Sequence, residues 1–189
     1  MPLVETGKLL VARPSLLDPN FRRTVVLVFQ HGAAFGTMGV VVNRPTAKKL
    51  RDVVEQIEGV HGRDDVLWNG GPVQPNAVWV LHRRADLDDK GEEVAPGMFL
   101  GGSPKLLTAL LRSTPANPAP VVFRTLRGYA GWAPGQLARE VREGAWRVLD
   151  ADPDVLFGAE GDPLWDEALV RAQLPFKPAA HVLRHAHLN

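Results

Sequence analysis

The N-terminal third of the chain carries runs of apolar residues that do not alternate with polar ones. Three such runs are "KLLVA" (8–12), "RTVVLVFQH" (23–31) and "TMGVVVNRP" (37–45). A strand that is apolar at every position is typical of a strand buried on both faces. We therefore predict three buried strands, of which 23–31 is central. The turn "GAAFG" joins the last two as a hairpin, and Pro45 ends the third strand.

Four segments further along have the spacing or the end signals of helices. In "AKKLRDVVEQI" (47–57), apolar residues recur at i, i+3, i+4 and i+7 and form one helical face: Leu50, Val53, Val54 and Ile57. In "SPKLLTALLRS" (103–113), Ser103 fits an N-cap and Pro104 fits the first helical position. The remaining expected helices span 133–144 and 163–174.

Strand patterns fill most of the remaining chain. They are "VLWNGGPV", "AVWVLHRR", "MFLGG", "PVVFRTLRGYAGW" and "AWRVLDA", at 66–73, 77–84, 98–102, 120–132 and 145–151. The first two lie around a Gly-Gly-Pro turn, and 84–97 is a polar loop. Because strands outnumber helices and often follow one another directly, a regular βαβ alternation does not fit. No repeat, linker or low-complexity tract divides the chain, so we expect one α+β domain over residues 1–189 with a mixed, mostly antiparallel sheet.

Composition and charge limit the function classes that fit, although the net charge leaves a local basic face possible. The chain has 189 residues, of which 22 are basic and 21 acidic, so its net charge of +1 gives no electrostatic footprint for nucleic acid. It contains no cysteine, which excludes disulfides, thiolate metal sites and cysteine nucleophiles. The longest apolar runs, such as "VVLVF" at 25–29, fall far short of the roughly 18 residues that span a bilayer. The N-terminus lacks a basic segment ahead of an apolar one, so we expect a cytoplasmic protein without membrane association.

Common catalytic and nucleotide-binding motifs do not occur in the chain. There is no G-x-G-x-x-G after the first strand and no G-x-x-x-x-G-K-[ST], and none of the three serines lies in G-x-S-x-G. "GGSPK" (101–105) is a glycine-rich turn that enters a helix, and its backbone could bind an anion beside Lys105. The simpler interpretation is that Ser103 caps the helix and the glycines form the turn. Nothing in the sequence implies a cofactor.

Two segments resemble metal sites but fail in their details. "DADPD" (150–154) begins like a Ca²⁺ loop, but Val155 replaces the glycine at the sixth position and Gly161 replaces the glutamate at the twelfth. A solvated turn is the simpler structure. His181 and His185 lie at i, i+4, but no third ligand is indicated, so we expect a surface tail and no metal.

Several blocks of sequence are more specific together than singly. They are, in order, "GKLLVARPSLLDPNFRRTVVLVFQH", "GTMGVVVNRP", "NGGPV", "VWVLH", "RGYAGWAPGQLAREVREGAWRV", "ADPDVLF" and "LWDEAL". With these blocks, from about residue 7 to residue 169, the chain resembles the YqgE/AlgH family of small bacterial proteins. The polar loop 84–97 and the His-rich tail 178–189 lie outside them.

The resemblance implies a fold and a label but no reaction. It implies a single α+β domain, whose mixed sheet curls toward a partial barrel and is flanked by helices, in a cytoplasmic bacterial protein. Members of the family carry the label of transcriptional regulators. The resemblance implies no catalytic residue and no cofactor.

The stretch "GYAGWAPGQLAREVREGAW" (128–146) holds two of the five tryptophans and the only tyrosine. Large aromatic side chains usually supply core area, so a scaffold role is the favoured interpretation. In the other interpretation, Trp132 lies exposed beside a groove and stacks on a ligand that Gln136 binds.

A candidate patch for binding a partner or ligand gathers residues of the family blocks, most of them at turns and strand ends. A rigid scaffold usually displays its functional groups at such places. The patch comprises Asp18, Asn20, Asn43, Arg44, Gly70, Gly71, Trp132 and Gln136. Several of its members have a local alternative. Asp18 and Asn20 can form Asx turns around Pro19, and Asn43 and Arg44 can pin the end of a strand.

Three functions follow from these observations, in order of preference. The first is a regulatory binding module that acts through a protein or small-molecule partner. The second is direct DNA binding, with Arg22, Arg23 and Arg44 as contacts. The third is a hydrolase-like enzyme that would use "NGGP", Asp18 and His82. The sequence identifies neither the partner nor the oligomeric state.

Overall fold

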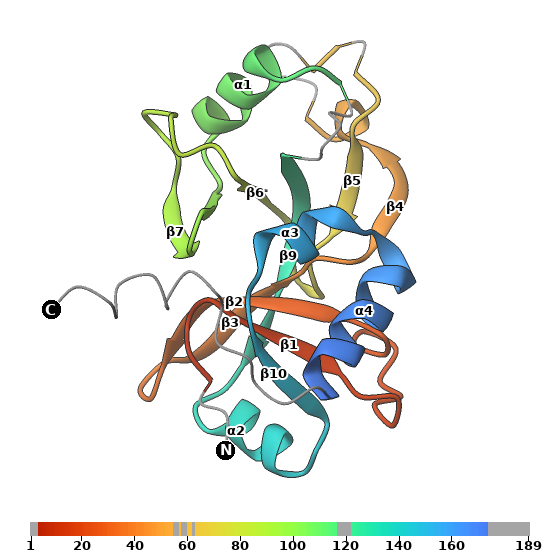
Figure 1. Ribbon diagram of the computed structural model, residues 1–189. Coiled ribbons are helices and arrows are strands. Elements are labelled where there is room, and N and C mark those ends of the chain that lie inside the picture. The colour runs from red at the N-terminus through yellow and green to blue at the C-terminus, as the bar shows by residue number, and fades with distance from the viewer. Residues whose placement is uncertain (1–3, 55–56, 58–59, 62, 117–121, 174–189) are drawn as a thin grey trace, which may run out of the picture.

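One curled sheet runs through the whole molecule, from an upper half near the top of Figure 1 to a lower half near its bottom. The computed structural model describes residues 4–54, 57, 60–61, 63–116 and 122–173. Within them the sheet has ten strands. These are β1 (Lys8–Ala12), β2 (Val25–Gly32), β3 (Gly36–Val41), β4 (Pro45–Lys49), β5 (Val66–Asn69), β6 (Val73–His82), β7 (Glu92–Ala95), β8 (Met98–Gly101), β9 (Phe123–Trp132) and β10 (Trp146–Asp150).

The helices lie outside this sheet, as Figure 1 shows, with α1 at the top, α2 at the bottom and α3 and α4 along one side. Their bounds are α1 (Pro104–Ser113), α2 (Gln136–Arg142), α3 (Pro153–Gly158) and α4 (Gly161–Gln173), with a short 3-10 helix, η1 (Leu50–Asp52). As predicted, Ser103 caps α1: its side chain accepts a hydrogen bond from the backbone N–H of Leu106, and Pro104 opens the helix.

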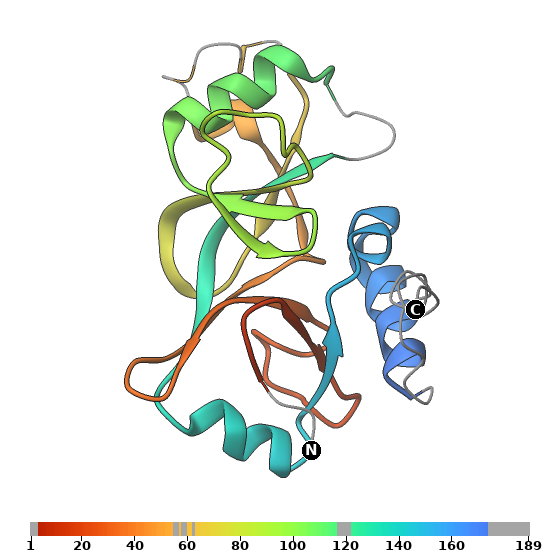
Figure 2. The ribbon, with the colours of Figure 1, turned by 60° about the vertical axis from the view of Figure 1, so that its left-hand side comes forward.

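Strand β9 belongs to both halves of the molecule (Figures 1 and 2). The strand order is β10-β1-β2-β3-β9-β6-β8-β7, and β5 joins β4 and β9 beside this path. The first part of β9 pairs with β5 and β6, and its last residues pair with β3. The β5–β9 pair is parallel and the other described pairs are antiparallel. The predicted α+β class, with a mixed, mostly antiparallel and curled sheet, is confirmed.

The continuous apolar runs are explained by burial on both faces of β1, β2 and β3. The buried apolar residues form three clusters, which we call the central, lower and upper cores. In β1, Leu9 and Val11 belong to the central core, whereas Leu10 and Ala12 point to the opposite face of the sheet and belong to the lower core. The residues of β2 divide in the same way between the two cores. The predicted hairpin of the second and third strands is present, with Val26 opposite Val41.

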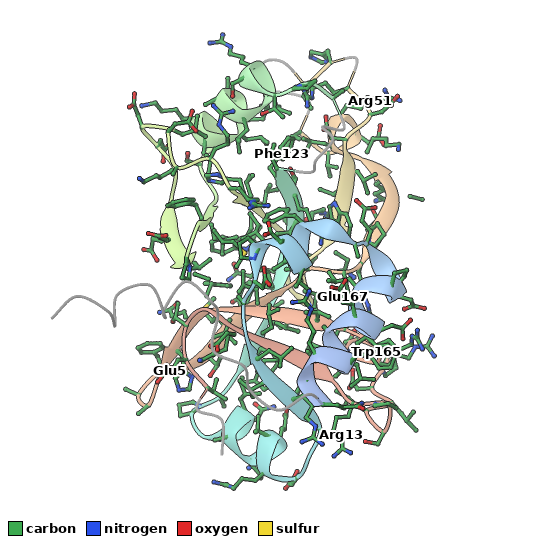
Figure 3. All side chains as sticks on the ribbon, in the orientation of Figure 1. Glu5, Arg13, Arg51, Phe123, Trp165 and Glu167 are labelled. Carbon is green, nitrogen blue, oxygen red and sulfur yellow. The ribbon has the colours of Figure 1, made fainter. Side chains whose placement is uncertain are left out.

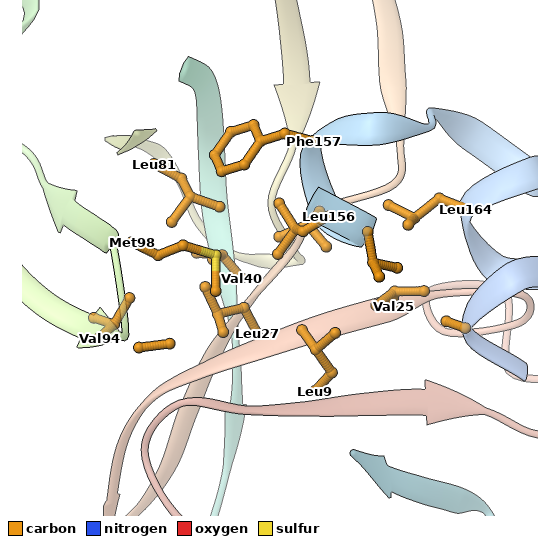
Figure 4. Close-up of a cluster of buried hydrophobic side chains, with 14 of the residues drawn as sticks. Leu9, Val25, Leu27, Val40, Leu81, Val94, Met98, Leu156, Phe157 and Leu164 are labelled. Carbon is orange, nitrogen blue, oxygen red and sulfur yellow. The ribbon is translucent and has the colours of Figure 1, made fainter. Parts of the chain in front are cut away.

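The upper and central cores join the helices to the sheet. In the upper core, four buried leucines of α1 pack with Phe123, at the upper end of β9 in Figure 3. In the central core, drawn in Figure 4, Leu156 and Phe157 of α3 and Leu164 of α4 pack with strand residues such as Leu27. These three helices are therefore held mainly by apolar burial.

The helix predicted over 47–57 is wrong. The chain there forms β4 and then η1, and β4 pairs with β5 from Pro45 opposite Trp68 to Lys49 opposite Val66. The apolar positions nonetheless face the upper core, where Leu50 is buried. Strand pairing has overridden the helical spacing, as tertiary context often does.

Three smaller expectations also need correction. Pro45 opens β4, since β3 already ends at Val41. The polar loop 84–97 contains β7. "DADPD" leads into α3, where Asp152 caps the helix by accepting the backbone N–H of Asp154 at 2.9 Å. The two strands predicted around the Gly-Gly-Pro turn are both present, and each of them pairs with β9.

The two halves meet where "NGGP" packs backbone against backbone on β9. A Cβ atom added to Gly71, which has φ +146°, would lie 2.3 Å from the carbonyl oxygen of Tyr129. One added to Gly128, with φ +71°, would lie 2.4 Å from the carbonyl oxygen of Gly71. Gly70 donates to the Arg127 carbonyl and accepts from Val41, both at 2.7 Å. Side chains at these glycines would therefore separate the strands.

Replacing Gly71 with alanine should lower the free energy of unfolding by several kcal/mol, about 3 or more, because the added methyl group meets backbone and the residue has positive φ. Gly135→Ala is the matched control. Gly135 also has positive φ, at +75°, but nothing lies within 4 Å of its added Cβ, so only about 1 kcal/mol is expected. Urea denaturation of both variants measures the difference. Equal losses would show that the close backbone approach is unimportant.

Candidate functional site

Three segments that are distant in sequence meet around a small polar recess, which we call the Arg44 recess. It is lined by Asn20, Val41, Arg44, Asn69, Gly71 and Pro72. Its volume is about 30 Å³, and a cavity needs about 10–15 Å³ to hold one water molecule, so the recess has room for a group of a few atoms. The predicted patch residues Asn20, Arg44 and Gly71 are thus brought together with "NGGP".

Short hydrogen bonds hold the first of these segments. The Asp18 carboxylate accepts the backbone N–H of Asn20 at 2.8 Å, which is an Asx turn around Pro19. The Asp18 carbonyl accepts the backbone N–H groups of Phe21 and Arg22. Asp18 therefore shapes the loop and does not line the recess, whereas the side chain of Asn20 is exposed at its wall.

Arg44 ties the second segment to this loop. Its guanidinium donates from Nη2 to the Arg22 carbonyl at 2.9 Å and from Nη1 to the Pro19 carbonyl at 3.3 Å. Burial lowers the pKa of Arg44, and the neighbouring charge of Arg22 lowers it further, while Asp162 and Asp18 act in the opposite direction. Arg44 is therefore a half-buried cation that is fixed in place by backbone oxygens.

The third segment presents an amide whose orientation is set by the backbone. Asn69 accepts the N–H of Gly71 through Oδ1 at 3.1 Å. A backbone N–H can only donate, so the oxygen of this amide must face it and Nδ2 is the atom that remains. Within the described residues Nδ2 of Asn69 has no acceptor.

Two residues with strained backbone lie close in sequence to the segments that form the recess. Among described residues other than glycine, positive φ occurs at Arg23, with +54°, and at Gln74, with +46°. Arg23 follows the loop at 18–22, and Gln74 follows "NGGP" closely. Strained non-glycine residues persist only where the surroundings determine them, and they often lie at functional sites.

The other predicted patch residues serve the scaffold. Asn43 is buried: its Oδ1 accepts the Val25 N–H at 2.9 Å, and its Nδ2 donates to the carbonyls of Arg23 at 2.9 Å and Gly161 at 3.2 Å. It therefore pins strand β2 to the start of α4. Gly70 is buried in the backbone contact with β9 described above.

Trp132 and Trp146, from the stretch Gly128 to Trp146, form an aromatic cluster with Phe21, and neither tryptophan lines the recess. Trp132 is only 5% exposed, and its ring lies 5.7 Å from that of Phe21 and 5.9 Å from that of Trp146. Both indole N–H groups donate to Oε2 of Glu140, at 3.0 and 2.8 Å.

Gln136 serves the same cluster. Its side chain donates to Oε1 of Glu140 at 2.9 Å and accepts the backbone N–H of Ala133 at 3.0 Å. Neither Trp132 nor Gln136 lines the Arg44 recess. Sequence reasoning missed Glu140, because no pattern shows that a charged helix residue turns inward.

Arg23 and His82, which the DNA-binding and hydrolase hypotheses use, have structural partners. Arg23 stacks at 4.2 Å over Trp165 of α4, labelled in Figure 3, and pairs with Asp162 at 3.1 Å and Asp166 at 3.4 Å. His82 is fully buried. Its Nε2 bonds the Lys90 carbonyl at 2.9 Å, and its Nδ1 accepts the backbone N–H of Arg84 at 3.1 Å.

A buried cation on β9, Arg124, escaped the sequence analysis. It is 1% exposed, and it donates to the carbonyls of Val42 at 2.5 Å and Ala159 at 2.6 Å. Its guanidinium lies 4.3 Å from the ring centre of Trp68. Burial lowers the pKa of Arg124 to about 10. Arg124 joins the end of α3 to the sheet, which is a structural role.

Other candidate sites have simpler explanations. The start of α1 is occupied by an acidic side chain, because the Ser103 hydroxyl donates to Asp89 at 2.6 Å. In the described ranges, no group of three or more metal-binding side chains was found. The His-rich tail at 178–189 lies outside those ranges. None of the described helices is long and apolar enough to cross a membrane.

Comparisons with known proteins relate the chain to one group. The model of the AlgH-like family (DUF179) matches residues 9–177. A UPF0301 protein of Chlorobium chlorochromatii is 42% identical over 167 residues, which are 88% of this chain and 85% of that protein. The solved structure of the AlgH protein from Pseudomonas aeruginosa has a TM-score of 0.71 and 30% identity, over 93% of this chain and 94% of that one. A Corynebacterium diphtheriae protein has the same TM-score at 26% identity, over 93% and 92% of the two chains.

Replacing Trp132 with alanine should lower the free energy of unfolding by about 3–5 kcal/mol, because a buried ring and its hydrogen bond are both lost. Arg139→Ala, on the exposed side of α2, should change it by less than about 0.5 kcal/mol. Urea denaturation measures both values. An unchanged midpoint for Trp132→Ala would support the exposed, ligand-stacking interpretation instead.

The free energy of unfolding should fall as the pH drops below about 6.5. Burial lowers the pKa of His82 in the fold, so the unfolded chain takes up a proton at a higher pH than the folded one. Stability from neutral His82 is therefore present above the unfolded pKa and lost as the pH falls toward the folded one. Urea titrations at pH 7.5 and 5.5 should show a smaller loss for His82→Gln than for the wild type. Equal losses would contradict a buried, neutral imidazole.

Proposed function

The chain belongs to the AlgH-like family, and we propose that it is a binding module that recognises a protein or small-molecule partner through the Arg44 recess. The observation that carries the proposal is a set of unused hydrogen-bond donors in a recess whose walls are fixed by the backbone. Arg44 and Asn69 each have part of their side chain committed to backbone groups, and the rest faces no acceptor in the described part of the chain. Polar groups that are held rigid and left without partners are typical of recognition sites.

A regulatory role would be exerted through this partner. The recess is too small to enclose a whole ligand, so it would take one polar group of the partner while the surrounding loops contact the remainder. The strained backbone at Arg23 and Gln74 supports this arrangement, because strain near a recess is compatible with loops shaped for a ligand.

Direct DNA binding is the second candidate function. Arg22 favours it, since this exposed side chain has no acidic partner among the described residues. Arg23 and Arg44 offer less, because the first is neutralised by two aspartates and the second is held by carbonyls. We do not propose a hydrolase, since both ring nitrogens of His82 are used within the fold.

Filling the recess should abolish partner binding without unfolding the protein. Asn20→Trp places a large ring at the wall, and the backbone N–H that holds this loop is unaffected. Ala138→Trp, on the exposed side of α2, is the matched control. Ligands and partners found by NMR screening of the wild type should bind Asn20→Trp at least about tenfold more weakly and bind the control unchanged.

Equal binding to both variants would place recognition elsewhere on the molecule. The same three proteins should also be titrated into labelled genomic DNA fragments and followed by fluorescence anisotropy. Tight binding with a steep salt dependence would favour the second candidate function, because phosphate contacts release counterions.

A further inference from the structure

We infer that the group bound by the Arg44 recess is a carboxylate, supplied by a small organic acid or by the C-terminus of a partner peptide. The inference rests on the proposed function and narrows its ligand class. It follows from the kind of hydrogen-bonding groups that the recess presents, from their charge and from its size.

The groups of Arg44 and Asn69 that have no partner in the described part of the chain are N–H donors. A guanidinium has five N–H groups, and two groups of Arg44 are committed to the carbonyls of Pro19 and Arg22. Asn69 has committed its oxygen to Gly71, so its NH₂ group remains. An ionised carboxylate only accepts hydrogen bonds, which matches such a wall.

Charge favours an anion at this place. Arg22 and Arg44 carry like charges, and the charge of Arg22 lowers the pKa of Arg44. Arg23, the third cation, is already paired with aspartates of α4. Asp162 and Asp18 act in the opposite direction on the pKa of Arg44, and each of them acts less strongly than Arg22 does. A bound anion would relieve the remaining repulsion.

Size distinguishes a carboxylate from larger anions. A recess of about 30 Å³ holds a group of a few atoms, whereas pockets for drug-sized ligands measure about 300–1,000 Å³. A nucleotide or a phosphorylated sugar would therefore remain mostly outside.

The site is organised before any ligand binds. The Asx turn at Asp18, the carbonyl contacts of Arg44 and the backbone packing of Gly71 on Tyr129 fix its three walls. Fixed walls reduce the entropy that binding costs, so even a small anion should give a saturable response.

Matched ligands test the inference directly. N-acetyl-leucine and N-acetyl-leucinamide differ only in the carboxylate, and each is titrated into ¹⁵N-labelled protein. The acid should shift the amide signals of Asn69 and Gly71 and the Asn69 side-chain signal saturably, with a Kd on the order of 1 mM, and the amide should not. A tripeptide ending in free leucine separates the two sources. Tighter binding than N-acetyl-leucine indicates a peptide C-terminus, and equal or weaker binding indicates a small organic acid.

Matched variants test which residues carry the binding. Asn69→Asp keeps an oxygen to accept the Gly71 N–H but replaces the remaining donor with a negative charge, so the fold should persist and affinity should fall at least about tenfold. Asn76→Asp makes the same change on an exposed residue of β6 that accepts from Arg127 and does not line the recess, so affinity should change less than about twofold.

Three outcomes would overturn the inference. They are equal binding of the acid and the amide, binding of inorganic phosphate at the same signals without binding of the acid, and equal loss in both aspartate variants. In the phosphate outcome the recess is still a binding site and the proposed function stands. The proposed function itself fails only if the recess-filling variant Asn20→Trp binds every ligand and partner as the wild type does.

Discussion

The contact on which the rest of the structure depends is the backbone packing of Gly70 and Gly71 on strand β9. Strand β9 is shared: β5 and β6 flank its beginning, and β3 pairs with its end. For the upper and lower strands to meet on one strand, the chain at 70–71 must approach the backbone of β9 more closely than a Cβ atom would allow. The glycine pair is therefore a requirement of the topology.

The same contact positions the candidate site. Asn69 precedes the glycines and Pro72 follows them, so both lie at the recess because the backbone between them is fixed on β9. Val41, another residue of the recess wall, donates its N–H to Gly70. A binding site built in this way needs no helix end and no flexible lid. Its support comes from the sheet, and sites built on strands are more precise than sites built on loops.

The strands were predictable from the sequence where burial alone determines them. Runs such as 25–28 are apolar at every position, and burial on two faces explains each residue. The helix at 47–57 was predicted wrongly because Leu50 and its neighbours satisfy the helical spacing and also face the upper core from an extended chain. Hydrophobic periodicity shows which residues are buried, but the partner strand β5, more than ten residues away, decides the conformation.

Only part of the candidate site could be predicted from the sequence, because three of the eight predicted patch residues line the recess and the other five do not. Arg44, Asn43 and Trp132 are all polar or aromatic residues at strand ends, and the sequence treats them alike. They differ in what else each one bonds: the donors of Asn43 and Trp132 are consumed inside the fold, whereas Arg44 keeps donors in reserve. Whether a donor or acceptor has a partner depends on which residues meet in the folded chain, and a single sequence does not show this. A polar residue is therefore a candidate for recognition only if some of its hydrogen-bonding groups have no partner inside the fold. Of the eight predicted patch residues, Asn20, Arg44 and Gly71 line the recess. Asn69, which directly precedes the two glycines, lines it as well.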